Sequence, residues 1–200
     1  MEPHSPSEAL YALSLSPLES QLREIYGRVV YTHKTHEKMA DGYVRRYRFI
    51  KTVEITLSAT TSGSLLFAVF SNSEVSTIVG AILSTILLGL TLYFKESSLG
   101  EQAQKHAVVA SKMWGIRESL LSLLTDMHDG RSVEEIRSER DRLNALLEEI
   151  YKSAPRTDGA AYAAAQKALK LNEELFFSDE ELDCMLPQKL RSTSAQRASK

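Results

Sequence analysis

The sequence has a single cysteine, Cys184, in 200 residues. One thiol excludes an internal disulfide framework and any metal site built from several cysteines. We therefore expect most of the chain to face a reducing compartment. Cys184 itself, next to Met185, is interpreted as a small apolar packing residue rather than a nucleophile.

A strong excess of one charge is also missing. Lys and Arg number 24 and Asp and Glu number 26, which gives a net charge of −2 at pH 7. Because no global basic field is present, we expect no direct binding of nucleic acid. The mean hydropathy of −0.21 is that of an ordinary soluble protein, but it averages over a very uneven distribution.

Sequence patterns for the common enzymatic sites are absent. The chain contains no G-x-x-x-x-G-K-[ST] loop, no G-x-G-x-x-G loop and no G-x-S-x-G elbow, which are the usual signs of phosphate cradling and serine hydrolysis. Its long apolar segments hold no acid, base or nucleophile suited to catalysis inside a membrane. We predict that the protein is not an enzyme and uses no cofactor.

Long hydrophobic runs, in contrast, are present. Residues 75–94 form twenty residues without a charge, enough for a helix of about 30 Å, the thickness of a hydrocarbon core. Residues 55–70 are sixteen apolar or small residues, about 24 Å of helix, and can cross if Lys51 and Glu54 snorkel at one end. The short connection at 71–74 makes the pair a transmembrane hairpin; the alternative for 75–94 is the buried core helix of a soluble fold.

The flanking charges predict the orientation of this hairpin. Residues 34–51 carry six basic and two acidic side chains, and the turn carries no Lys or Arg. By the positive-inside rule we expect both termini to lie in the cytoplasm and the chain to be a multi-pass membrane protein. No cleaved signal peptide is expected from the first residues. The predicted topology determinants are Arg45, Arg46, Arg48, Lys51 and Lys95; the alternative for the three arginines is contact with an anionic ligand.

The remaining sequence predicts helices only. Apolar residues recur at helical spacing at Leu18, Leu22, Ile25 and Val29, at Ile116, Leu120, Leu124 and Met127, and at Ile136, Leu143, Leu147 and Ile150. Gly130 fits a helix stop, Ser132 and Ser178 fit helix starts, and 159–175 fits a further helix. The predicted fold is all-α: a disordered N-terminus (1–16), a juxtamembrane cytoplasmic helix (17–52), the hairpin (53–94), a cytoplasmic helical region (95–187) and a disordered basic tail (188–200).

Small and hydroxyl-bearing residues line one side of each span. They are Ser58, Thr61 and Ser62 in the first span and Thr77, Gly80, Ser84 and Thr91 in the second. Such residues let helices approach closely and bond to each other. They can therefore close the two helices of one hairpin, or line a weakly polar pore, which would require several copies of the chain.

Two histidines precede the first span. His33 and His36 are three positions apart, with Glu37 beside them, and two imidazoles on one helix face can bind a metal. No cysteine or further histidine stands nearby at a ligand spacing, so we predict no metal site. The favoured interpretation is a packed polar cluster close to the membrane surface.

Several short motifs together resemble the SLATT family (SMODS and SLOG-associating two-transmembrane effector domains). They are YTHKTHEK at 31–38, LSATTSG at 57–63, WGIRESLLSLLTD at 114–126, RDRL at 140–143, IY at 150–151 and APRT at 154–157. The resemblance covers about residues 18–175 and marks His33, Lys34, Thr35, His36 and Glu37 as a juxtamembrane family motif.

The resemblance implies a membrane effector of a bacterial antiphage or conflict system that oligomerises and perforates or depolarises the inner membrane on an infection-linked signal. It also implies a partner that generates or senses a nucleotide. The alternative function is a non-conducting membrane adaptor that recruits a cytoplasmic partner through amphipathic helices. The lipid bilayer is a partner in either case.

Overall fold

The computed structural model describes residues 17–71 and 74–191. They form helices α2 (Pro17–Ser71), α3 (Glu74–Glu96), α4 (Leu99–His128), α5 (Val133–Ser153), α6 (Gly159–Lys170) and α7 (Asp179–Met185), and a 3₁₀ turn η1 (Gln188–Leu190). No strand occurs in these two ranges, so the all-α prediction is confirmed. The predicted disordered segment 1–16, residues 192–200 of the predicted tail, and Asn72 and Ser73 of the predicted turn lie outside the described residues.

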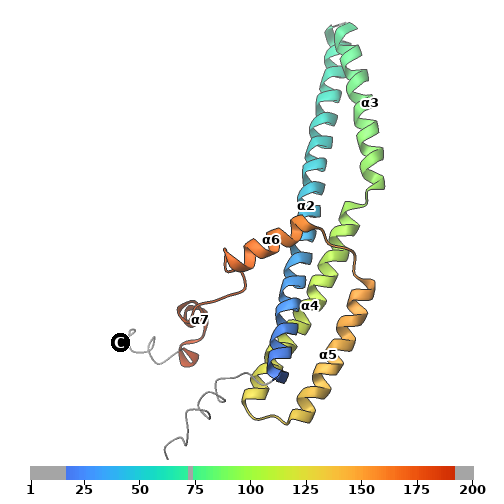
Figure 1. Ribbon diagram of the computed structural model, residues 1–200. Coiled ribbons are helices and arrows are strands. Elements are labelled where there is room, and N and C mark those ends of the chain that lie inside the picture. The colour runs from blue at the N-terminus through green and yellow to red at the C-terminus, as the bar shows by residue number, and fades with distance from the viewer. Residues whose placement is uncertain (1–16, 72–73, 192–200) are drawn as a thin grey trace, which may run out of the picture.

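One continuous helix, α2, connects the membrane hairpin with the rest of the described chain, which we call the helical body (residues 17–52 and 99–170). It has 55 residues, or about 80 Å of helix, without a break between the predicted juxtamembrane helix and the first span. Helix α3 packs antiparallel to the C-terminal half of α2, and α4 packs along the N-terminal half of α2 (Figure 1). The helical body and the membrane hairpin are therefore joined by the unbroken helix α2 on one side and by a short connection between α3 and α4 on the other.

That short connection contains a left-handed residue. Ser98, at the N-cap of α4, has φ 40° and ψ 38° and makes no side-chain capping bond. A left-handed conformation costs a residue with a Cβ atom roughly 1–2 kcal/mol, but costs glycine little. Helix α4 begins much earlier than the apolar stripe at 116–127 indicated, because the chain turns at this residue and resumes a helix at once.

We expect Ser98→Gly to stabilise the protein by up to about 1 kcal/mol, because glycine removes this strain. Ser98→Val should destabilise it, since a β-branched residue fits the left-handed region worst. Thermal unfolding of both variants in the same detergent measures the effect. A lower melting temperature for the glycine variant would contradict the strain at this position.

The core of the helical body lies between α2, α4 and α5. Its fully buried side chains include Leu22 and Val29 of α2, Met113, Leu120 and Leu123 of α4, and Ile136 and Leu143 of α5. These residues come from the apolar stripes of the three helices, and Leu18, Leu124 and Met127 pack against the same core. Trp114 is 53% exposed and does not belong to the core.

The helix boundaries follow local chemistry. Gly130 has φ 90° after α4, and Ser132 caps α5 by accepting a hydrogen bond from the backbone of Glu135. Helix α6 ends at Lys170 instead of Leu175, because the amides of Leu171 and Asn172 turn back to the carbonyl of Lys167. The chain then leaves the helix through Glu173, which has φ 51°.

Candidate functional site

The hairpin of α2 and α3 presents large apolar side chains to its surroundings. Phe70 is 87% exposed, Val75 70% and Ile78 60%, and no other helix of the described chain covers this end of the molecule (Figure 1). A core helix of a soluble protein would be buried on most sides. Both helices are long and apolar enough to cross a membrane, and their exposed surface is of the kind that lipid covers.

The two helices meet along a narrow seam of small and aliphatic residues. It consists of Leu57, Thr61, Ser64 and Ala68 in α2 and Ser76, Gly80, Leu83, Leu87, Leu90 and Phe94 in α3, which are buried or half-buried within the hairpin. Ser64 Oγ donates a hydrogen bond of 2.9 Å to the carbonyl of Ser76. A Cβ atom on Gly80 would lie 2.8 Å from Leu65 Cδ2, so a larger residue here would require the half-exposed side chain of Leu65 to move.

Only some of the small and hydroxyl-bearing residues predicted to line one side of each span lie in this seam. Thr61 and Gly80 are buried in it, whereas Ser58, Ser62, Thr77, Ser84 and Thr91 are exposed. For Thr61 and Gly80 the structure gives the packing role. The five exposed residues remain candidates for lining a pore, and we call them the hydroxyl flank.

Helix geometry places the hydroxyl flank on one side of the hairpin. Each member follows a seam residue by one position, as Ser58 follows Leu57 and Ser84 follows Leu83. One residue is a rotation of about 100° in a fixed sense. Because the two helices are antiparallel and face each other, this rotation turns both sets of side chains to the same side.

The opposite side of the hairpin is more apolar. Its positions precede the seam by one residue and are Thr56, Thr60, Gly63 and Phe67 in α2 and Val75, Val79, Ile82, Ile86, Gly89 and Tyr93 in α3. The hydroxyl flank is itself interrupted by Leu65, Val69, Ala81 and Leu88. The hairpin therefore has one weakly polar side, and α3 contributes no hydroxyl to the other except through Tyr93.

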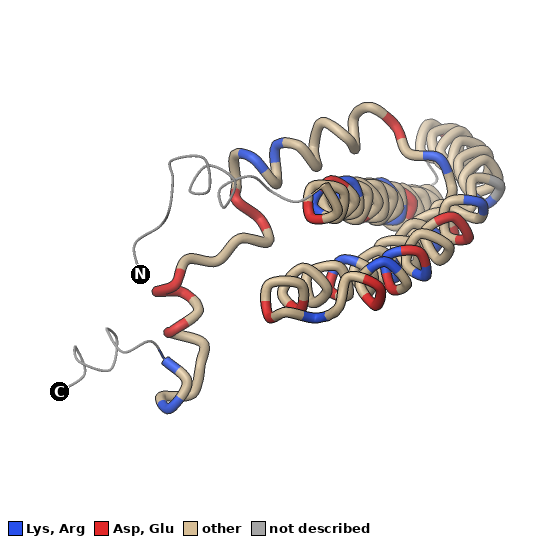
Figure 2. The backbone as a smooth tube through the Cα atoms, turned by 60° about the horizontal axis from the view of Figure 1, so that its bottom comes forward, with Lys and Arg blue, Asp and Glu red and all other residues tan. Residues whose placement is uncertain are grey.

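The basic residues predicted as topology determinants lie where the hairpin joins the helical body. Arg45, Arg46, Arg48, Lys51 and Lys95 are all exposed. Lys51 Nζ lies 2.8 Å from Glu54 Oε2, and this hydrogen bond raises the pKa of Lys51. Charged residues are distributed along the helices outside the hairpin (Figure 2), as expected if only the hairpin enters the membrane.

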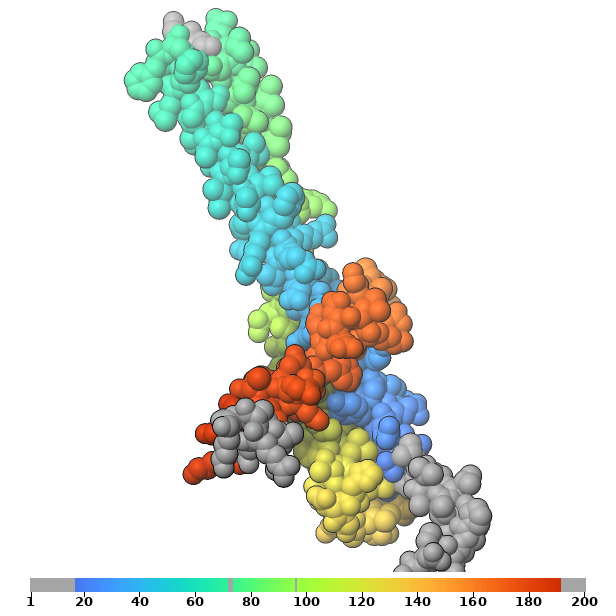
Figure 3. Space-filling model, turned by 90° about the vertical axis from the view of Figure 1, so that its left-hand side faces the viewer, coloured from blue at the N-terminus to red at the C-terminus, as the bar shows by residue number. Residues whose placement is uncertain are grey.

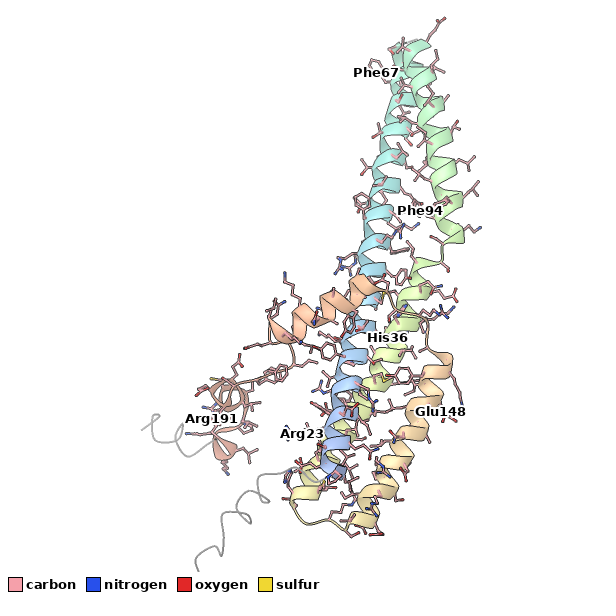
Figure 4. All side chains as sticks on the ribbon, in the orientation of Figure 1. Arg23, His36, Phe67, Phe94, Glu148 and Arg191 are labelled. Carbon is pink, nitrogen blue, oxygen red and sulfur yellow. The ribbon has the colours of Figure 1, made fainter. Side chains whose placement is uncertain are left out.

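A buried polar cluster joins α2 to α4 just below the hairpin. His36 Nδ1 lies 2.9 Å from His106 Nδ1, and the two residues are only 3% and 1% exposed. Since an N–H must face a bare nitrogen, one ring donates and the other accepts. Burial, and then the neighbouring His106, lower the pKa of His36 to about 4, and burial also lowers the pKa of His106, so the pair is neutral at pH 7. His36 is labelled in Figure 4.

His33 belongs to the same interface. Its Nδ1 lies 2.9 Å from the carbonyl oxygen of Ala110 in α4 and therefore donates the hydrogen bond. Its Nε2 lies 3.5 Å from Glu37 Oε1. Tyr43 stacks on His106 with ring centroids 5.6 Å apart. Within the described ranges no group of three or more potential ligands could hold a metal ion, and His33 and His36 contact α4 instead.

Lys34 connects α2 with the segment that follows α6. Its Nζ lies 2.8 Å from Glu37 and 2.7 Å from Glu174, and Lys38 lies 3.1 Å from Glu174. Burial acts to lower the pKa of Lys34, but hydrogen bonds to Glu174 and Glu37 outweigh it and raise the pKa. The two lysines lower the pKa of Glu174 to about 2. Thr35 only bonds back to the carbonyl of Tyr31.

We expect Glu174→Ala to loosen residues 171–178, because Lys34 then keeps one of its two carboxylate partners. The expected loss is about 1 kcal/mol of local stability, the usual contribution of such a hydrogen bond. Hydrogen exchange of these amides measures it, with Glu173→Ala as the neighbouring control. Equal protection in Glu174→Ala and the unchanged chain would contradict the role of this contact.

The sequence identified the motif at 33–37 but not its partners. His106, Tyr43 and Glu174 complete the cluster, and His106 and Glu174 are 70 and 140 residues away from the α2 residues they contact, His36 and Lys34. His106 stands alone among apolar and charged residues, without a ligand spacing. No local pattern could have paired it with His36.

Comparison with known proteins identifies a family. The family model for SMODS and SLOG-associating 2TM effector domain family 4 (SLATT_4) matches residues 18–181. No curated protein and no solved structure matches the chain. The matched range contains the hairpin, the polar cluster and the three-helix core.

Proposed function

The chain belongs to SLATT family 4, a family of effector domains with two transmembrane segments, and from this premise we propose that it is a membrane effector that depolarises the inner membrane of a bacterium. In this proposal several copies assemble, their hydroxyl flanks face a common axis, and ions pass between them. Both termini lie in the cytoplasm. The signal is infection-linked and reaches the protein through a partner that generates or senses a nucleotide. No catalytic step is involved.

The observation that carries the proposal is the exposed position of the hydroxyl flank. A single hairpin cannot enclose water, so a pathway needs several copies. In each copy the more apolar side can face lipid while Ser58, Ser84 and Thr91 face the axis. Hydroxyls used only to close the hairpin would lie in the seam, as Thr61 does.

The quiet state of this effector is assigned to the cytoplasmic contacts. The neutral His36–His106 pair and the Lys34–Glu174 contact hold α4 and the segment after α6 against α2. A signal that favours another arrangement of α4 would be transmitted to α3 through the connection at Ser98. It would shift the population from the quiet state to a conducting state.

Membrane potential in living cells tests the proposal. A voltage-sensitive dye is recorded after induction of the full chain, with and without its genomic neighbours and phage challenge. Rapid depolarisation that requires residues 55–94 is the expected result. A membrane that stays polarised while the cells are protected would overturn it.

That second result would favour the adaptor function. The adaptor function is supported by apolar surface outside the hairpin, such as the half-exposed Trp114, Tyr151 and Tyr162. An adaptor would retain a partner at the membrane after leucine replaces every hydroxyl of the hydroxyl flank. A depolarising effector would lose its activity with the same change.

A further inference from the structure

A cavity lies between α2 and α6 close to the base of the hairpin, and we call it the α2–α6 cavity. Helix α6 crosses α2 there and lies against it (Figure 1, Figure 3). The cavity has a volume of about 310 Å³, at the lower end of the range of small-molecule sites. Met39 of α2 and the alanines Ala160, Ala161 and Ala164 of α6 give it apolar walls. Because these α6 side chains are small, they leave the space beside α2 open.

Two arginines line this cavity without a partner within the chain. Arg45 and Arg46 both belong to the lining, and both are exposed. Neither guanidinium group forms an ion pair or a hydrogen bond with residues 17–71 or 74–191. Unpaired guanidinium groups beside one cavity favour an anion. Phosphate fits them best, because the planar fork of arginine donates two parallel hydrogen bonds to its oxygens.

The other charged groups of the lining leave this positive charge in place. Lys38 lies 3.1 Å from Glu174, which it shares with Lys34, so its charge is already compensated. Asp158 is the one acid among the described residues of the lining. Its Oδ1 accepts a hydrogen bond of 2.7 Å from the backbone N–H of Ala161, and the positive end of α6 offsets its charge. The two arginines therefore determine the sign of the cavity.

The cavity lies at the depth of the lipid headgroups when α3 spans the bilayer. The apolar run of α3 ends at Phe94 and is followed by Lys95. Both residues line another cavity together with Tyr47 of α2, so this run ends within about one helical turn of the level of Tyr47. Arg45 and Arg46 directly precede Tyr47. Their side chains therefore reach the level at which the hydrocarbon core gives way to phosphate groups.

We propose that the α2–α6 cavity binds the phosphate group of one anionic phospholipid, with Arg45 and Arg46 as its donors. A free phosphate ion has the same chemistry, but the depth of the cavity and its apolar walls favour a phosphate that is attached to a lipid. The bound lipid would connect α6 with α2 beside the base of the hairpin. The inference goes beyond the proposed function, because it requires a chain inserted in a membrane but neither a pore nor a signal.

Binding of phosphatidylglycerol to the full-length chain tests the proposal. The protein is purified in a non-ionic detergent, freed of lipid and titrated with phosphatidylglycerol, and native mass spectrometry counts the bound molecules. We expect one tightly bound molecule. Arg46→Gln should weaken its binding about tenfold, since one charged donor to phosphate is lost. A chain that retains no phosphatidylglycerol would overturn the proposal.

The matched control for the charge is Arg48→Gln. Arg48 is also exposed and carries the same charge two residues further along α2, but it is not among the residues that line the cavity. Its replacement should leave the affinity for phosphatidylglycerol unchanged. Equal losses in Arg46→Gln and Arg48→Gln, or no loss in Arg46→Gln, would contradict a specific site.

Filling the cavity tests its shape without changing any charge. Ala164 lines the cavity, and Ala164→Phe should weaken the binding of phosphatidylglycerol about tenfold by occupying the space that the headgroup needs. Ala163→Phe is the control, because Ala163 is exposed on α6 and does not belong to the lining. The same comparison decides if Arg46→Gln fails to accumulate. Equal affinities of the two phenylalanine variants would reject the cavity as the site.

Inorganic phosphate and phosphatidylcholine identify the source of the phosphate group. Excess inorganic phosphate should leave the bound phosphatidylglycerol in place, and phosphatidylcholine, which has no net charge, should bind more weakly. Displacement of the lipid by inorganic phosphate would reject the lipid as ligand, and equal binding of the two lipids would reject selection of an anionic headgroup. These measurements do not involve conduction, so a chain that binds the lipid but does not depolarise cells would retain this inference and reject the pore.

Discussion

Replacing Ser84 and Thr91 together with leucine should reduce signal-triggered depolarisation at least tenfold at equal expression. Both side chains are exposed and belong to the hydroxyl flank. Leucine adds bulk and removes the hydroxyl, and apolar constrictions close pores by expelling water. Neither residue lies in the seam, so the hairpin itself should still form. A voltage-sensitive dye in infected cells measures the loss.

The chain provides a matched control for this experiment. Thr56 and Thr60 are also exposed threonines of the hairpin, but they lie on its opposite side, and each bonds back to a carbonyl four residues earlier. Thr56→Leu with Thr60→Leu should leave depolarisation unchanged. Equal losses in the two pairs would mean that leucine acts on insertion or packing, and unchanged depolarisation in the first pair would reject the assigned lining.

Mild acid should destabilise the helical body by about 2 kcal/mol between pH 7 and pH 5. The pKa of His36 falls from 6.5 in the unfolded chain to about 4 in the folded one. Below pH 6.5 the unfolded chain therefore binds a proton that the folded chain does not. Stability contributed by neutral His36 is present above pH 6.5 and is lost as the pH falls toward 4. Thermal unfolding at constant ionic strength measures this slope.

The range from pH 7 to pH 5 separates this effect from that of Glu174. The pKa of Glu174 is lowered from 4.5 to about 2, so its contribution is present above pH 4.5 and is lost only at lower pH. Replacing both His36 and His106 with phenylalanine should remove most of the slope, since no buried imidazole remains at this contact. His128→Gln, at the far end of α4, is the control. A double variant with the slope of the unchanged chain would contradict the assignment.

Much of the fold could be predicted because its signals are local. The apolar run at 75–94 predicts α3 directly, and the stripe of Ile136, Leu143 and Leu147 predicts the buried face of α5. The sequence pattern does not predict that α2 continues unbroken past residue 52 or that α4 begins as early as Leu99. The surface of α2 changes from water to lipid along the helix, so no single apolar period describes it, and the start of α4 depends on the left-handed residue Ser98.

The candidate site was predictable in part for a similar physical reason. The spacing of Ser84 and Thr91 shows that they share a helix face, but not whether that face meets α2. Burial in the hairpin places Thr61 and Gly80 in the seam and leaves the hydroxyl flank exposed. The partners His106 and Glu174 depend on tertiary contacts across distant parts of the chain, which sequence spacing does not contain.

Water access to the hydroxyl flank tests the central claim most directly. In a Cys184→Ser background, Ser84→Cys and Thr60→Cys are each treated with a membrane-impermeant charged thiol reagent in cells whose depolarisation has been recorded. The account predicts that the thiol of the Ser84→Cys protein reacts in depolarised cells and is protected in polarised ones, while the thiol of the Thr60→Cys protein stays protected in both. A protected thiol at position 84 in a depolarised membrane, or equal reaction at both positions, would contradict it.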